Sequence, residues 1–237
     1  MCGIVGYVGK NQAPSILIDG LGKLEYRGYD SAGIAVFDGN EINIAKTKGR
    51  LSNLIKLLLE NPLSGTIGIG HTRWATHGAP SDTNSHPHIS EDHKIAVVHN
   101  GIIENYMDIK EELLKEGYHF LSETDTETIA HLIDYYYKES MDFEDSVFKA
   151  VSRLEGSYAL GIICKDSPDK LIAVRKGSPL VIGKGNGENF IASDIPALLN
   201  YTREVYFLEE EEIAVITDND ISIYDSNRNK IERDIYH

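Results

Sequence analysis

Apolar residues recur along this chain with two periods, and each period predicts a different kind of element. Spacings of three and four residues predict helices at 13–24, 51–58, 106–113, 129–136 and 147–154. Apolar, β-prone segments predict strands at 2–8, 32–37, 41–46 and 94–99, and alternation of apolar or functional side chains with Gly and Thr predicts one at 66–73. Beyond residue 156 the alternation dominates, and we expect strands at 157–164, 170–175, 180–183, 189–192, 204–208, 211–216 and 221–224, with a short helix near 195–200.

Turn and loop signals separate these segments. Asp38-Gly39 lies between two predicted strands and is a strong hairpin signal. The glycine-rich run 183–187 is interpreted as a hairpin loop, because no helical pattern follows it. Residues 75–93 are polar and contain two prolines, which predicts a long loop. Loops of that length inside a compact domain are usually functional or disordered.

The order of the elements indicates the fold class. Strand-rich ends surround a helix-rich middle, and no internal repeat is present. This order predicts an α+β fold in which two mainly antiparallel sheets pack together and helices cover their outer faces.

Composition and charge narrow the class of partner. The 237 residues are 41% hydrophobic, which is ample for a buried core, and 37 acidic against 23 basic residues give a net charge of −14. No dense run of Lys or Arg occurs, which argues against nucleic acid and anionic membrane surfaces as partners. The apolar runs are strand-sized, no secretory signal is recognisable, and the two cysteines lie far apart. We therefore expect a soluble, cytoplasmic protein.

The first candidate for chemistry is Cys2, directly after the initiator Met1. Removal of Met1 would leave the thiol and a free α-amine on one residue, and such an amine can serve as the base for its neighbouring nucleophile. An unperturbed α-amine has a pKa of about 7.7–8.0 and a thiol one of about 8.5, so both work near neutral pH. An ordinary first strand that carries a cysteine is the alternative, and the dipeptide alone leaves both open.

A second candidate lies where the strand predicted at 66–73 enters the polar loop. Arg73 at a strand end can hold a carboxylate through two parallel hydrogen bonds, although a surface ion pair is the ordinary alternative. Trp74 is interpreted either as a core anchor or as part of a hinged lid.

Two further candidates follow a strand and precede a helix. The side-chain amide of Asn100 and the backbone N–H of Gly101 could form an oxyanion hole, but Asn-Gly is also a common turn pair, and the turn is the favoured local interpretation. Thr124 or Asp125 is the expected N-cap of the next helix, with Glu127 near its positive end. Asp125 could instead bind a substrate ammonium group, and the pattern does not choose.

Other polar features have simpler interpretations. Cys164 shares a strand face with apolar residues and is predicted to be a core residue. His86, His88 and His93 lack the thiolates or carboxylates at the spacing that metal sites use, so no metal site is expected. The acidic run 209–212 is interpreted as a solvated turn before a strand.

Taken together, these stretches resemble a known family. Residues 2–6, 24–33, 71–78, 85–88, 98–105, 122–127, 178–181 and 192–194 match, in order, the glutaminase domain of the glutamine–fructose-6-phosphate aminotransferases, which make glucosamine 6-phosphate. These are class II glutamine amidotransferases of the N-terminal-nucleophile hydrolase superfamily. The runs at 26–33 and 71–78 look specific to this sugar-phosphate branch. The resemblance implies a four-layer αββα sandwich and no cofactor or metal.

The resemblance also implies a reaction. Cys2, freed of Met1, would attack the side-chain carboxamide of L-glutamine, and its own α-amine would take the thiol proton through a water and later protonate the departing ammonia. Asn100 and Gly101 would hold the tetrahedral oxyanion. A γ-glutamyl thioester would form and then be hydrolysed. Arg27 lies in a matching motif and would support the site without a definite chemical step.

The same resemblance assigns the substrate contacts. Arg73 would hold the α-carboxylate of glutamine and Asp125 its α-ammonium group. Thr76 and His77 would line the substrate loop, and Trp74 would be the lid residue that gates the passage of ammonia.

In the family a synthase half, built from two sugar-isomerase-like lobes, uses the ammonia to aminate fructose 6-phosphate. This chain ends about where that half would begin, so we expect residues 1–237 to be the glutaminase domain alone, with the last ten or so residues leading to a linker. The full-length enzyme would be a homo-oligomer. The alternatives are the glutaminase half of another amidotransferase, such as the one acting on phosphoribosyl pyrophosphate, and a non-catalytic glutamine-sensing module that keeps Met1.

Overall fold

The computed structural model describes residues 1–75 and 78–237 and contains two seven-stranded antiparallel sheets over that part of the chain. The first sheet has the order β11-β9-β10-β1-β4-β2-β3. Its strands are β1 (Gly3–Val8), β2 (Ser31–Phe37), β3 (Ile42–Lys48), β4 (Ile67–Arg73), β9 (Val181–Lys184), β10 (Asn189–Ala192) and β11 (Glu204–Phe207).

The second sheet has the order β14-β13-β12-β8-β7-β6-β5. Its strands are β5 (His88–Ile89), β6 (Ile95–Ile103), β7 (Gly156–Cys164), β8 (Ser167–Lys176), β12 (Glu212–Ile216), β13 (Ile221–Tyr224) and β14 (Lys230–Ile231).

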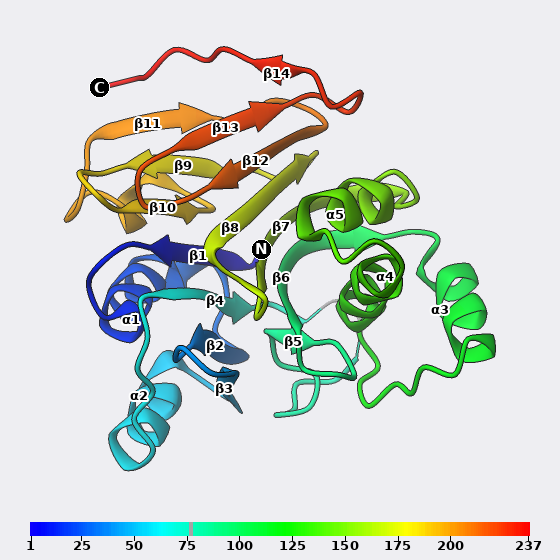
Figure 1. Cartoon of the computed structure of the whole chain (residues 1–237). Helices are drawn as coiled ribbons and strands as arrows, with labels where there is room; N and C mark the ends of the chain where they lie inside the picture. The colour runs from blue at the N-terminus through cyan, green and yellow to red at the C-terminus, as the bar shows by residue number, and fades with distance from the viewer. Residues whose placement is uncertain (76–77) are drawn as a thin grey trace.

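Helices cover the outer faces of both sheets (Figure 1). α1 (Ala13–Leu24) and α2 (Leu51–Glu60) pack on the first sheet, and α3 (Tyr106–Lys115), α4 (Asp125–Ser140) and α5 (Phe143–Val151) pack on the second. Two short 3₁₀ helices, η1 (Glu25–Arg27) and η2 (Ile195–Ala197), lie beside the first sheet. The predicted α+β arrangement with four layers, αββα, is confirmed.

Three apolar clusters hold the layers together, and alternation along the strands assigns each side chain to one of them. In β1, for example, Ile4 and Val8 point between the sheets, whereas Val5 and Tyr7 point toward α1. Burial of these apolar side chains is worth about 1.5–3 kcal/mol each. The five predicted helices are present. Among the described residues, none of the helices has both the length and the apolar character that crossing a membrane requires.

Three sequence expectations need correction. The Asn100-Gly101 pair is not a turn, because β6 continues through it to Ile103, with Asn100 opposite Ala159 of β7. The loop expected at 75–93 contains the short strand β5, which pairs with β6. The helix expected near 195–200 is limited to the single turn η2.

The acidic run at 209–212 also differs from expectation at its last residue. Glu212 is the first residue of β12 and is buried rather than solvated. The guanidinium group of Arg233 pairs with its carboxylate, and this partner lies too far along the chain for a local pattern to reveal. Predictions that were right include the hairpin of β2 and β3, the hairpin loop between β9 and β10, and the buried position of Cys164.

The last residues of the chain contact the first sheet. Tyr236 exchanges two backbone hydrogen bonds of 2.9 Å with Val205 of β11. The segment after β14 therefore returns across the sandwich toward β11 (Figure 1).

Candidate active site

A cavity of about 290 Å³ opens at the end of the sandwich where β1 begins and β4 ends. Most residues singled out from the sequence line it: Cys2, Arg27, Arg73, Trp74, Asn100, Gly101 and Asp125. Arg73, Asn100 and Gly101 lie in strands of the two sheets, Cys2 and Trp74 lie next to strand ends, and Arg27 and Asp125 belong to η1 and α4. The predicted contributions of Thr76 and His77 lie outside the described residues.

Cys2 provides the thiol of the cavity. Its Sγ accepts a hydrogen bond from the backbone N–H of Trp74 at 3.1 Å and lies 3.4 Å from the carbonyl oxygen of the same residue. Burial raises the pKa of the thiol above its ordinary value, and the Trp74 N–H only partly opposes this effect. The thiol is therefore protonated near neutral pH, and attack by sulfur requires a base that removes this proton.

Arg27 holds the backbone of the same residue. Its Nε donates to the carbonyl oxygen of Cys2 at 2.9 Å, and its Nη1 lies 3.9 Å from Asp194. A Cβ on Gly28 would lie 2.7 Å from the backbone carbon of Arg73. The chain after η1 can therefore pass against the end of β4 only because residue 28 is glycine.

Asn100 and Gly101 lie in β6, across the sheet interface from Cys2. Nδ2 of Asn100 donates to the Cys2 carbonyl oxygen and to Oγ of Ser193, both at 3.0 Å. Gly101 has a φ of +116°, and a Cβ there would lie 2.0 Å from the carbonyl oxygen of Ser157. This conformation excludes other residues at position 101. Sequence reasoning assigned no role to Ser193, although it lies in one of the matching runs.

Arg73 and Asp125 carry opposite charges at the cavity, which Arg27 also lines, and both are buried. Nη2 of Arg73 donates to the carbonyl oxygen of Gly78 at 2.9 Å. Oδ2 of Asp125 accepts from the backbone N–H of Ile103 at 2.9 Å. The helix cap is Thr124, whose hydroxyl accepts from the N–H of Glu127, so Asp125 is not the cap and its carboxylate turns toward β6.

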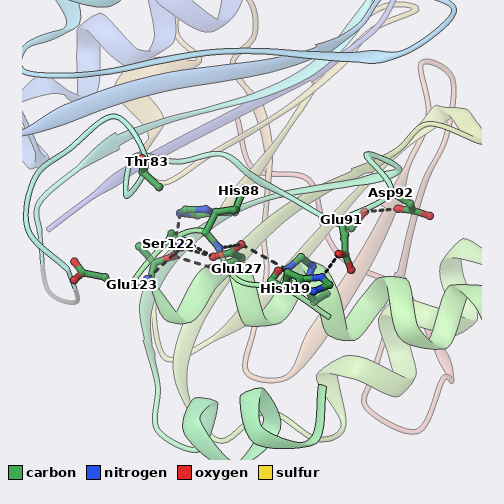
Figure 2. A network of polar contacts seen from close by, with 12 residues as sticks. Thr83, His88, Glu91, Asp92, His119, Ser122, Glu123 and Glu127 are labelled. Atoms are coloured by element: carbon green, nitrogen blue, oxygen red, sulfur yellow. Dashed lines mark hydrogen bonds and ion pairs between the residues drawn. The ribbon is translucent and has the colours of Figure 1, made fainter. Parts of the chain in front are cut away.

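A second network fixes the segment just before Asp125 (Figure 2). The carboxylate of Glu127 accepts from the backbone N–H groups of Leu121 and Ser122, at 2.9 and 2.7 Å, and from the Ser122 hydroxyl at 2.6 Å. Burial acts to raise the pKa of Glu127, but hydrogen bonds from His131, Leu121 and Ser122 outweigh it and lower the pKa to about 2. An ionised Glu127 therefore anchors the entry to α4.

Two histidines, His86 and His99, line the cavity. The ring of His71, which is not among the lining residues, stacks on His86 with centroids 4.1 Å apart. His88 lies edge-on to His86 and bonds through Nε2 to the Thr124 hydroxyl at 3.0 Å. Burial lowers the pKa of His71 to about 3 and those of His86 and His88 well below the ordinary value. In the described part of the chain, no three His, Cys, Asp or Glu side chains are grouped so that they could hold a metal ion.

Trp74 lies at the mouth of the cavity. Its side chain is 48% exposed and packs edge-on against Tyr29, with ring centroids 5.5 Å apart. The alternative of a core anchor is therefore wrong.

Comparison with known proteins places this geometry in context. A family model described as a glutamine amidotransferase domain matches residues 71–200. Among similar sequences, the glutamine–fructose-6-phosphate aminotransferase (isomerizing) of Clostridium perfringens is 59% identical over 237 residues, and that of Caldanaerobacter subterraneus is 58% identical over 236. Each alignment covers 100% of this chain but 38% of the relative, so the chain spans well under half the length of these proteins.

Solved structures show the same architecture. The glutamine phosphoribosylpyrophosphate amidotransferase from B. subtilis, complexed with ADP and GMP, superposes with a TM-score of 0.82 at 29% identity. The match covers 97% of this chain and 50% of that one. An allosteric regulatory enzyme of purine biosynthesis gives a TM-score of 0.81, also at 29% identity, over 96% of this chain and 50% of that one.

Proposed function

This chain belongs to the family of glutamine amidotransferase domains, and from that membership we propose that it hydrolyses L-glutamine to L-glutamate and ammonia. One observation carries the proposal. A thiol, a guanidinium group, a carboxylate and a side-chain amide line one cavity of about 290 Å³, supplied by Cys2, Arg73, Asp125 and Asn100. These are the groups that binding and hydrolysis of an amino acid with a carboxamide side chain require.

Binding of glutamine uses Arg73 and Asp125. The guanidinium group of Arg73 holds the α-carboxylate, since a planar fork matches a carboxylate through two parallel hydrogen bonds. The carboxylate of Asp125 holds the α-ammonium group. The side chain of the substrate then extends toward Cys2, and Thr76 and His77 line the loop that covers it.

The reaction requires an unblocked amino terminus. Once Met1 is removed, the α-amine of Cys2 takes the thiol proton through a water, and sulfur bonds to the carboxamide carbon. The tetrahedral intermediate collapses when the protonated α-amine of Cys2 gives its proton to the carboxamide nitrogen of the substrate, which leaves as ammonia. Water then attacks the γ-glutamyl thioester and the carbon–sulfur bond breaks. Glutamate is released, and the thiol of Cys2 is regenerated.

Two N–H groups stabilise the oxyanion of each tetrahedral intermediate. They are Nδ2–H of Asn100 and the backbone N–H of Gly101, and one such donor is worth about 2.7–4 kcal/mol. In this structure both Nδ2 hydrogens of Asn100 are donated, to the carbonyl oxygen of Cys2 and to the Ser193 hydroxyl at 3.0 Å, so one of these bonds is exchanged for a bond to the oxyanion when it forms. Arg27 donates to the same carbonyl oxygen and fixes the backbone of the nucleophile.

The proposal extends to the longer relatives. Residues 1–237 form one glutaminase domain whose last ten or so residues lead to a linker. In a full-length, homo-oligomeric cytoplasmic enzyme, Trp74 gates ammonia toward a synthase region that aminates fructose 6-phosphate. The chain alone then releases ammonia from glutamine and produces no glucosamine 6-phosphate.

Intact mass and covalent labelling test the proposal. We expect the mass to lack one methionine, a glutamine analogue with a reactive diazoketone to label Cys2, and added glutamine to slow the labelling. Ammonia release should accompany glutamate formation in equal amounts. A chain that retains Met1 and binds glutamine reversibly without turnover would instead be a glutamine sensor. An unblocked chain that leaves glutamine intact would overturn the proposal.

A further inference from the structure

The side-chain amide of Asn100 has a partner on the opposite sheet. His71 lies in β4 and is 1% exposed, and its Nε2 is 3.0 Å from Oδ1 of Asn100. The same Nε2 is 2.9 Å from the carbonyl oxygen of His99. One imidazole nitrogen therefore contacts two oxygen atoms of β6.

Hydrogen-bond chemistry assigns the proton on this imidazole. A backbone carbonyl oxygen can only accept, so Nε2 of His71 carries the hydrogen and Nδ1 carries none. The burial that lowers the pKa of His71 to about 3 keeps the ring neutral, so this tautomer persists through the physiological pH range. The stacked ring of His86, inclined by only 11°, packs against its face.

The tautomer in turn assigns the orientation of the amide. Since Nε2 of His71 donates, the group of Asn100 that faces it must be the oxygen. The amino group of Asn100 then points the other way, where the Cys2 carbonyl and the Ser193 hydroxyl accept at 3.0 Å. If the amide were flipped, Nδ2–H of Asn100 would face Nε2–H of His71, and Oδ1 of Asn100 would face the carbonyl oxygen of Cys2. Neither pair could form a hydrogen bond.

We propose that His71 is a positioning residue of this site, which acts by holding the Asn100 amide with its amino group on the side of Cys2, where the oxyanion would form. The proposal rests on the glutaminase function proposed above, because the amide has a catalytic use only if an oxyanion forms. His71 is absent from the lining of the cavity, so it acts through Asn100 and not on the substrate.

The first experiment does not depend on turnover. Nitrogen-15 NMR of the labelled chain should show His71 as the neutral Nε2–H tautomer, unchanged between about pH 8 and pH 5. The Nδ1–H tautomer, or protonation within that range, would overturn the proposal. This measurement decides whether His71 can orient Asn100 even if the chain releases no ammonia, in which case the proposed function fails separately.

The second experiment measures the coupling between the two residues. His71→Leu should lower kcat by about 10–100-fold, as loss of an orienting partner typically does, with KM nearly unchanged. His71→Gln, which keeps an amide N–H donor, should recover most of kcat. In an Asn100→Ala background, His71→Leu should cause no further loss, because the group it orients is gone.

Control variants separate positioning from stability. Asn189→Ala removes a buried side chain with two hydrogen bonds at the other end of β1, where residue 189 pairs with Val8, and should leave kcat unchanged. Equal losses from His71→Leu in the wild-type and Asn100→Ala backgrounds would overturn the proposal. If His71→Leu does not fold, the tautomer of His71 measured in the wild-type chain decides the proposal.

Discussion

The space between the two sheets has an apolar middle and a polar end, and the same strand faces build both. Along β4, the inward face carries Ile67 and Ile69 and then His71 and Arg73. Along β6, Ala96 and Val98 precede Asn100, and in β1 Ile4 follows Cys2. A period of two therefore brings the reactive groups into one layer with the core.

The two regions are held together by different forces. In the middle, apolar side chains pack without a required direction, and about 25 cal/mol is gained for each Å² removed from water. At the end, each buried polar atom needs a partner in a defined direction, since burial without one costs about 1–3 kcal/mol. The contacts of Asn100 with His71, Cys2 and Ser193 show this arrangement. We therefore expect changes at the end to affect activity and changes in the middle to affect stability.

The largest expected effect separates the two cysteines. Cys2→Ala should abolish turnover, because Cys2 supplies the only thiol among the described residues that line the cavity, while glutamine binding and the free energy of unfolding change little. Cys164→Ala, in the apolar cluster under α4, should keep full turnover and lose about 1 kcal/mol of stability, a typical cost for one substitution. Ammonia release and urea unfolding of both variants test this contrast. Wild-type turnover in Cys2→Ala would remove Cys2 from the mechanism.

Two residues on one face of β6 give the next contrast. Asn100→Ala should lower kcat by about 10²–10³-fold, the usual cost of one oxyanion donor, with a small effect on KM. Val98→Ala, two residues earlier on that face, should lower the free energy of unfolding by about 2 kcal/mol because a buried valine side chain is truncated. Its kcat should stay at the wild-type value. An unchanged kcat in Asn100→Ala would leave the amide a structural role only.

The apolar middle is also the region that the sequence predicts well. Short apolar, β-prone runs identified nearly all strands of both sheets, because most of these strands are buried on both faces. The polar end was predicted through candidate residues, but their orientations were not. Asn100-Gly101 resembles a turn locally, and only pairing with β7 and the cross-sheet bond to His71 extend β6 through it. The choice between capping and binding at Asp125 likewise depended on Thr124 taking the cap.

An intermediate effect concerns Glu127, which holds the entry to α4. Its pKa of about 2 is below the ordinary value, so its ionised form stabilises the fold above about pH 4.5 and this contribution is lost as the pH falls toward 2. Glu127→Gln should lower the free energy of unfolding by about 1.5–3 kcal/mol at pH 6. Urea titrations should show this difference shrinking as the pH falls to about 3.

The neighbouring exposed acid provides the control for Glu127. Glu123→Gln, which Figure 2 shows at the same loop, should change stability by no more than about 0.5 kcal/mol. If Glu127→Gln lowers the free energy of unfolding equally at pH 6 and pH 3, the shape of the Glu127 side chain matters for stability and its charge does not.

The smallest expected effect tests whether the two regions are independent along one strand. Ile69→Val removes one methyl group from the intersheet core two residues before His71, and should cost about 0.5–1.5 kcal/mol of stability. β4 is paired on both sides at this position, with Gly6 of β1 and Ala35 of β2. These backbone hydrogen bonds should hold the end of the strand in place, so kcat and KM should stay at their wild-type values. A tenfold loss of kcat in a folded Ile69→Val protein would mean that core packing sets the position of His71 and Arg73, and the distinction between middle and end would no longer hold.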